Sequence, residues 1–305
     1  MHHLLAAIDL GTNTARLLIG RHLPDGTVQP VTVSRRITRL GGGFTRESGI
    51  SPEARERTLA ALHEFAAEMK RHDVQHLRAV ATSAVRDAAN GKEFCREVLE
   101  TTGIRLEVIK GEEEGLLTLR GVLAVIDKRP ESLFVFDVGG GSTEYTLSQG
   151  ETPLFTRSLP LGVVRLTEGK GECGAMIEKI DRELNALRDE VGKKGLLPKL
   201  GNAMLVGTAG TATTLAAISM SMIDYDYRRV NNHTLSRAEI DAIFTRLLPL
   251  SPAERLLVPG MEKGREDLIL AGCLLTLRTM ELFGFERMKV SDFGLLEGIL
   301  LSVQE

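Results

Sequence analysis

One short stretch of this sequence combines a turn suited to an anion with two acidic side chains. Residues 134–147 read Phe-Val-Phe-Asp-Val-Gly-Gly-Gly-Ser-Thr-Glu-Tyr-Thr-Leu. The apolar residues at either end are typical of two buried strands, and three glycines allow a tight turn and close approach of a ligand to the backbone. The N–H groups of such a turn can cradle an anion, and Asp137 and Glu144 bracket it with carboxylates. The candidate binding residues are Gly139, Gly140, Gly141, Ser142 and Thr143.

A second stretch near the N-terminus matches the first without a gap. Residues 6–19 read Ala-Ala-Ile-Asp-Leu-Gly-Thr-Asn-Thr-Ala-Arg-Leu-Leu-Ile, and Asp9 aligns with Asp137 at an offset of 137 − 9 = 128 residues. An apolar strand, an Asp, a Gly and a polar hairpin that occur twice predict two related halves facing one cleft. Arg16 stands in the position of Glu144, a difference that suits a metal-bound phosphate held on one side and attacked on the other. This hairpin adds the candidates Thr12, Asn13 and Thr14.

A third stretch is rich in glycine and threonine. Residues 205–215 read Leu-Val-Gly-Thr-Ala-Gly-Thr-Ala-Thr-Thr-Leu, which predicts a buried strand that turns directly into a helix. Backbone N–H groups at the start of a helix attract phosphate. An ordinary strand-to-helix turn remains the alternative. The candidates here are Gly207, Thr208, Gly210 and Thr211.

Composition sets the class of protein. The 305 residues are 43% hydrophobic and 26% charged, which is typical of a soluble globular protein, and the length favours two domains. The formal net charge of −3 argues against general binding to nucleic acid. Three widely spaced cysteines fit a reducing compartment, and no apolar run is long enough to span a bilayer. We therefore expect a cytoplasmic protein with neither a nucleic acid nor a membrane as partner.

Positive charge is nevertheless concentrated in two segments. Residues 35–57 hold six Arg against three Glu, and residues 70–92 hold five Lys or Arg against two Asp. Local fields rather than the total charge steer a ligand, so these segments suit a polyanionic chain. Solvated helix faces are the alternative.

The order of the predicted elements repeats along the chain. Strands at 4–10, 15–21 and 27–37 are followed by a helix that begins at Ser51, and the order restarts at Phe134. We expect Arg86 in the first turn of one continuous helix that extends through Leu99, and helices at 236–247, 252–257 and 261–283. The predicted domains are residues 1–126 and 127–293.

Together these stretches resemble the exopolyphosphatase / guanosine pentaphosphate phosphohydrolase (Ppx/GppA) family in its short two-domain form. The resemblance implies an α/β fold of the actin-like, sugar-kinase and heat-shock-70 ATPase superfamily. Two ribonuclease H-like domains would each hold a mixed sheet flanked by helices, with the active site in the cleft between them and helix 294–305 packed on the first domain. The similarity continues through Ala81–Asp87, Gly111–Glu114, Leu159–Glu168 and Ser291–Gly298.

Hydrolysis of a phosphoanhydride bond, which the family implies, requires charge neutralisation, alignment and a base for water. Asp9 and Asp137 are the expected Mg²⁺ ligands, with Glu144 as a further ligand of metal or water. Mn²⁺ in the same place and an additional monovalent cation are also compatible with the sequence.

The remaining roles follow from charge and from the resemblance. Arg16 and Arg86 are candidate phosphate clamps, and the family adds Arg265, whose alternative is a surface position on a helix. Alignment with the family places the water-activating base at Glu114; the alternative is a helix start favoured by the helix dipole, with Glu144 as the base. We expect acidic neighbours and partial burial to raise the pKa of Glu114.

Several functions remain open. Release of terminal phosphate from inorganic polyphosphate is favoured, because the arginine-rich segments suit a long chain. Hydrolysis of guanosine pentaphosphate (pppGpp) uses the same chemistry but needs a guanine pocket, and the chain has no Trp and three Tyr. A kinase or chaperone-type ATPase would need a sugar or peptide site, and a non-catalytic phosphate sensor is the simplest alternative. A homodimer is compatible with each of these.

Overall fold

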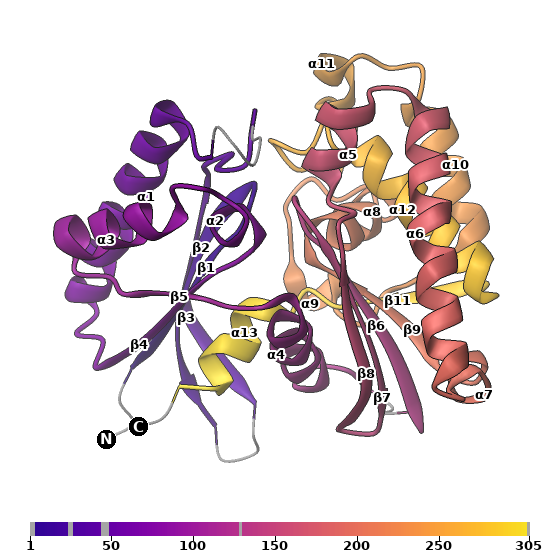
Figure 1. The fold of residues 1–305 in the computed structure, drawn as a ribbon, viewed down its shortest axis with the longest axis horizontal. Coiled ribbons are helices and arrows are strands. Elements are labelled where there is room, and N and C mark those ends of the chain that lie inside the picture. The colour runs from indigo at the N-terminus through magenta and orange to yellow at the C-terminus, as the bar shows by residue number, and fades with distance from the viewer. Residues whose placement is uncertain (1–3, 24–26, 44–48, 128–129, 304–305) are drawn as a thin grey trace. The chain divides into compact units, whose positions relative to one another are not determined.

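The computed structural model describes residues 4–23, 27–43, 49–127 and 130–303. Two compact units make up the chain: Met1–Ala124 with Phe293–Glu305, and Val125–Asp292 (Figure 1). Each is built on one β-sheet. Within the described ranges, no helix is long and apolar enough to cross a membrane.

The first unit contains a five-stranded sheet of order β3-β2-β1-β4-β5. The pairs β1–β2 and β2–β3 are antiparallel, whereas β1–β4 and β4–β5 are parallel. Its elements are β1 (Leu5–Leu10), β2 (Thr14–His22), β3 (Val28–Ile37), α1 (Pro52–Arg71), β4 (His76–Ala81), α2 (Ser83–Arg86), α3 (Gly91–Thr102), β5 (Leu106–Val108), α4 (Gly111–Leu123) and α13 (Leu295–Leu301).

Helices cover both faces of this sheet, so its central strand β1 is buried along its whole length. Alternate residues of a strand point to opposite faces. Ile8 therefore belongs to a cluster with Phe65 of α1 and Phe94 of α3, whereas Ala7 belongs to a cluster with Leu117 of α4 and residues of α13.

The helices α4 and α13 touch through their backbones (Figure 1). A Cβ atom added to Gly121 would lie 1.9 Å from the carbonyl oxygen of Gly294, and one added to Gly298 would lie 1.8 Å from that of Leu117. No side chain larger than hydrogen fits at either position. Residues far apart in the sequence thus form one tightly packed pair in the first unit.

The second unit contains a six-stranded sheet of order β10-β11-β9-β6-β7-β8. Its core packs Phe134 and Phe136 against Tyr145, with ring centroids 5.6 and 5.9 Å apart. Its elements are β6 (Ser132–Val138), β7 (Thr143–Gln149), β8 (Thr152–Leu159), α5 (Val163–Lys170), α6 (Cys173–Lys193), α7 (Leu197–Gly201), β9 (Met204–Thr208), α8 (Ala209–Ser219), α9 (Tyr227–Val230), β10 (Thr234–Ser236), α10 (Arg237–Leu247), α11 (Pro252–Arg255), α12 (Ile269–Phe283) and β11 (Arg287–Val290).

The strand order β3-β2-β1-β4-β5 of the first sheet recurs as β8-β7-β6-β9-β11 in the second, where β10 is added at the edge, and the hairpin strands match at an offset of 128. In the hairpins, Asp9 pairs with Arg16 and Asp137 with Glu144. The pairing of the second strand with the third also shifts register at matching positions. The shift follows Ile19 of β2 in the first unit and Leu147 of β7 in the second, and 147 − 19 = 128. The predicted internal repeat and both hairpins are therefore confirmed.

Two helix predictions were wrong. The expected continuous helix through Arg86 is two helices, α2 and α3, because Asn90 uses its side chain to bind the backbone N–H and C=O of Ile50 (2.8 and 2.9 Å). The helix expected at 261–283 begins only at Ile269. Gly264 adopts a left-handed conformation (φ 85°), which a continuing right-handed helix cannot contain.

Candidate active site

The glycine turn between β6 and β7 is held from one side only. Val163 and Val164, at the start of α5, donate their N–H groups to the carbonyl oxygens of Gly139 (3.0 Å) and Gly140 (2.9 Å). In a trans peptide the C=O and the following N–H point in opposite directions. The N–H groups of Gly140 and Gly141 therefore point away from α5, an arrangement that can bind an anion.

Other residues of this turn have structural roles. The hydroxyl of Thr143 donates to the carbonyl oxygen of Leu161, and Ser142 is buried. A Cβ atom on Gly162 would lie 2.1 Å from the carbonyl oxygen of Gly140, so only glycine lets α5 approach the turn this closely. Thr143 thus fixes the hairpin, and the backbone provides the anion-binding groups.

The N-terminal hairpin is held in a similar way by residues 38–41. The carbonyl oxygen of Asn13 accepts N–H bonds from Thr38 (3.1 Å) and Arg39 (2.9 Å), and that of Thr12 accepts one from Gly41 (2.9 Å). By the same peptide geometry, the N–H groups of residues 13 and 14 point away from this segment. Both hairpins therefore carry backbone donors at matching tips.

Three buried side-chain atoms of the first hairpin have no hydrogen-bond partner among the described residues. They are both polar atoms of the amide of Asn13, which is 6% exposed, and Oδ1 of Asp9. Leaving a buried polar group unsatisfied costs about 1–3 kcal/mol. A water molecule, cation or substrate oxygen at this place would remove that cost.

A row of charged side chains crosses each sheet below the hairpin tip. In the first unit, Arg16 donates from Nε (3.0 Å) and Nη2 (2.7 Å) to Oδ2 of Asp9, and Arg35 of β3 stands directly opposite Arg16. The side chains of this row carry one negative and two positive charges, so it is positive overall.

The corresponding row of the second unit is negative. Asp137 stands opposite Glu144, and Ser158 of β8 stands on the other side of Glu144. The Ser158 hydroxyl donates to Oε1 of Glu144 at 2.7 Å. Sequence reasoning missed Ser158; pairing β8 with β7 in register would have found it.

The three glutamates at the start of α4 differ in environment. Glu112 and Glu113 are exposed, and Glu113 accepts from Nη2 of Arg78 at 2.8 Å. Glu114 is 6% exposed, with Oε2 3.6 Å from Nη1 of Arg86. Nη1 of Arg86 also donates to the carbonyl oxygen of Ile109 (2.9 Å). A cation thus lies beside Glu114, where we expected acidic neighbours.

Arg265 covers the turn between β9 and α8. A Cβ atom on Gly210 would lie 1.6 Å from Cζ of Arg265, so the guanidinium occupies the space above this glycine. The Arg265 side chain is 13% exposed and donates from Nε to Glu262 (2.6 Å). The alternative of a surface arginine on a helix is wrong, since Arg265 is largely buried and precedes α12.

The backbone of this turn is strained. Ala209 has φ 61°, a left-handed conformation that costs a non-glycine residue free energy and clusters at functional sites. Thr208 and Thr211 beside it are buried. Gly207 has a packing role, because a Cβ there would lie 2.5 Å from Sδ of Met288.

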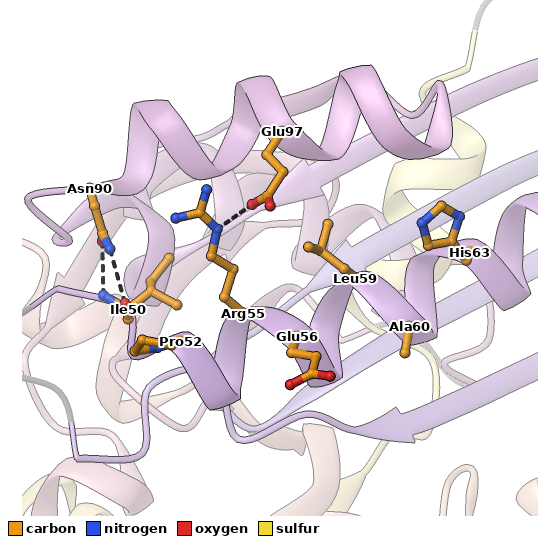
Figure 2. A pocket seen from close by; sticks show the side chains of 9 residues that line it. All are labelled: Ile50, Pro52, Arg55, Glu56, Leu59, Ala60, His63, Asn90 and Glu97. Atoms are coloured by element: carbon orange, nitrogen blue, oxygen red, sulfur yellow. Dashed lines mark hydrogen bonds and ion pairs between the residues drawn. The ribbon is translucent and has the colours of Figure 1, made fainter.

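Part of the positive charge of the arginine-rich segments is paired with acidic residues of the same unit. Arg46 lies outside the described residues. Figure 2 shows one example, a depression of about 750 Å³ between α1 and α3 in which Arg55 pairs with Glu97; none of the predicted site residues lines it. The arginines in these pairs give little support to a track for a long chain, which stays a prediction for the other cations of the two segments. Further pairs are Arg36 with Glu64, Arg55 with Glu93, Arg71 with Glu68, Arg78 with Glu107 and Glu113, and Arg86 with Asp87 and Glu114.

The two related sheets and their matching hairpins define an α/β protein of the actin-like ATPase fold. The chain belongs to the Ppx/GppA phosphatase family, whose sequence model matches residues 19–305. It is 34% identical over 317 aligned positions to exopolyphosphatase 2 of Mycobacterium tuberculosis, covering 98% of each chain. It is also similar to the solved Ppx/GppA family member of Aquifex aeolicus (30% identity, TM-score 0.79, 99% and 97% of the two chains) and to an exopolyphosphatase of Cytophaga hutchinsonii (26%, 0.87, 97% and 96%).

Proposed function

We propose that this protein is a magnesium-dependent hydrolase that releases terminal phosphate from inorganic polyphosphate. The observation that carries the proposal is the pair of matching hairpins, each with backbone donors at its tip, one above a positive row and the other above a negative row. Relatives named exopolyphosphatase support the choice of substrate.

Binding would use backbone donors and guanidinium groups. The N–H groups at the hairpin tips and at the start of α8 would hold successive phosphates. Arg16 and Arg265 would neutralise their charge, and both are held in place by carboxylate partners, Asp9 and Glu262. Such a site requires no contact with a base or sugar.

The acidic residues fit a hard cation such as Mg²⁺. Asp137 and Glu144 are cross-strand neighbours with like charge, and Oδ1 of Asp9 is a buried oxygen without a hydrogen bond to the described residues. In the described part of the chain, no three acidic, His or Cys side chains are placed so that they could together hold a metal ion. Mg²⁺ usually binds one or two carboxylates and takes its other ligands from water and phosphate. When bound, it would neutralise charge on the transferred phosphoryl group.

Glu114 is the proposed base. A carboxylate oxygen would accept a proton from the attacking water, while Arg86 stabilises its negative charge. Ser158 would orient Glu144 as the second acidic group. In this proposal the first unit contributes the base Glu114 and the clamp Arg16, and the second contributes the clamp Arg265 and the acidic pair Asp137 and Glu144.

The test is phosphate release from long polyphosphate, inorganic tripolyphosphate, pppGpp and ATP in the presence of Mg²⁺. We expect the inorganic chains to be hydrolysed fastest and EDTA to abolish the reaction. Release from none of the four would refute the proposal. Fastest release from pppGpp would establish the second candidate, which one feature of the second unit favours.

A further inference from the structure

A tyrosine beside the proposed phosphate site is held at its hydroxyl and open at its ring. The hydroxyl of Tyr225 donates to Oδ1 of Asp292, and the side chain of Thr213 on α8 is near enough to this hydroxyl to lower the pKa of the phenol. Burial of the hydroxyl end and the Asp292 carboxylate raise the pKa of Tyr225, so the phenol remains protonated. The residue as a whole is nevertheless 53% exposed.

The partners of Tyr225 place it at the edge of the sheet where the phosphate-binding turns lie. Asp292 directly follows β11, and the preceding Ser291 donates its N–H to the carbonyl oxygen of Gly207 in β9 (3.0 Å). Thr213 lies in the first turns of α8. Tyr225 therefore packs next to the start of α8.

Arg265 links this tyrosine to the turn. Its guanidinium occupies the space above Gly210, and it is close enough to Tyr225 to oppose the rise in the pKa of the phenol. The Arg265 guanidinium over the turn at Gly210 would hold a phosphate, and the Tyr225 ring beside it offers a flat apolar surface. Inorganic polyphosphate has no group that would use such a surface.

We propose that the ring of Tyr225 is a stacking platform for the base of a nucleoside polyphosphate whose phosphates lie on the Gly210 turn and Arg265. The inference rests on the proposed function, because it uses the same phosphate site. Bases stack on aromatic side chains through their π-faces. Because the hydrogen bond to Asp292 already holds this side chain, little conformational freedom is lost on binding. Tyr225 would thus set how well nucleotides compete with inorganic chains.

The molecule offers a matched control. Tyr227 lies two residues further on, is 37% exposed, and has the Arg228 guanidinium 5.8 Å from its ring centroid. It begins the short helix α9. If the loss of any exposed tyrosine from this segment changed KM for pppGpp, Tyr225→Ala and Tyr227→Ala would change it equally.

The experiment compares Tyr225→Ala, Tyr225→Phe and Tyr227→Ala in the full chain, with pppGpp and inorganic tripolyphosphate as substrates. We expect Tyr225→Ala to raise KM for pppGpp about tenfold, from the loss of one stacking contact, and to leave KM for tripolyphosphate within about twofold. Tyr225→Phe keeps the ring and should retain most of the affinity for pppGpp. Tyr227→Ala should change neither value.

Three outcomes would overturn the inference. Tyr225→Ala could change KM equally for both substrates, or Tyr225→Phe could raise KM for pppGpp as much as Tyr225→Ala does. In the third, the unmodified protein hydrolyses tripolyphosphate, and pppGpp is neither hydrolysed nor inhibits that reaction. Each leaves the proposed phosphatase activity intact. Absence of phosphate release from either substrate by the unmodified protein would instead refute the proposed function.

Discussion

The two hairpins share a backbone and differ in charge. Both close at the same register, and their third strands are irregular at matching positions, yet one row holds Asp9, Arg16 and Arg35 and the other Asp137 and Glu144. In the first row the acid already has a cationic partner. In the second, two acids stand directly opposite each other, and like charges in that position repel. The same backbone arrangement thus carries a net positive row of side chains in the first unit and a net negative row in the second.

A comparison of kcat for Glu114→Gln and Glu144→Gln decides which unit supplies the base. We expect the largest loss of kcat in Glu114→Gln. Glu114→Gln keeps shape and hydrogen bonding, and should lower kcat about 10²–10⁴-fold with little change in KM, as expected for the loss of a general base. Steady-state phosphate release measures it. The controls Glu112→Gln and Glu113→Gln should stay near normal, because both side chains are exposed. Normal turnover in all three would make Glu144 the leading base.

Replacing the aspartate of each row should change the magnesium requirement of the reaction by a different amount. Asp137→Asn and Asp9→Asn should both lose activity. Asp137→Asn should raise the Mg²⁺ concentration for half-maximal rate by about tenfold or more, the scale seen when a metal site is perturbed. Asp9→Asn should raise it less, because Arg16 already balances Asp9. Titration of the rate with Mg²⁺ measures both; equal shifts would contradict the asymmetry, and normal rates in EDTA would exclude the metal.

Stability without metal gives an independent comparison of the rows. In EDTA at pH 7, Glu144→Gln removes one of two like charges and should raise Tm by about 1–4 °C, from a gain of at most about 1 kcal/mol. Arg16→Gln leaves the carboxylate of Asp9, 7% exposed at its side chain, without its cation and should lower Tm. Thermal unfolding measures both. The same sign of change for the two variants would contradict opposite electrostatics.

The smallest effect is expected away from both rows. Arg55→Gln should change KM for long polyphosphate by less than about twofold, since the guanidinium already pairs with Glu97 and Glu93 and surface pairs have weak effects. KM for long and short chains at two salt concentrations tests this. A selective loss of affinity for long chains would restore the idea of an arginine track.

The sequence was informative where a pattern is local. Apolar runs around a polar turn predict a hairpin, and an exact offset between two such runs predicts a repeat, so the core of the fold and the hairpin tips were predictable. Burial separates Glu114 from Glu112 and Glu113, but only a complete helix register with its packing partners shows which of three adjacent glutamates faces inward.

Contacts between distant segments were not predictable. The start of α5 and residues 38–41 hold the two hairpins through main-chain atoms. Their trace in the sequence is a glycine at each contact, Gly162 and Gly41, and a glycine alone does not name its partner. Arg265 was placed on a helix because its neighbours are helix formers, and the left-handed Gly264 overrides that propensity. Ser158 and Tyr225 depend on strand pairing and on one long-range hydrogen bond.

The contact of α4 with α13 has a consequence for the order of folding during synthesis. The second unit is continuous from residue 125 to residue 292, so all of it leaves the ribosome before α13 does. Until then the face of the first sheet that carries Ala7 lacks half of its helical cover, and the glycines of α4 have no partner. The first unit is therefore synthesised first but completes its packing last. Until α13 has been synthesised, the apolar side chains on this face of the sheet stay exposed and could bind a chaperone.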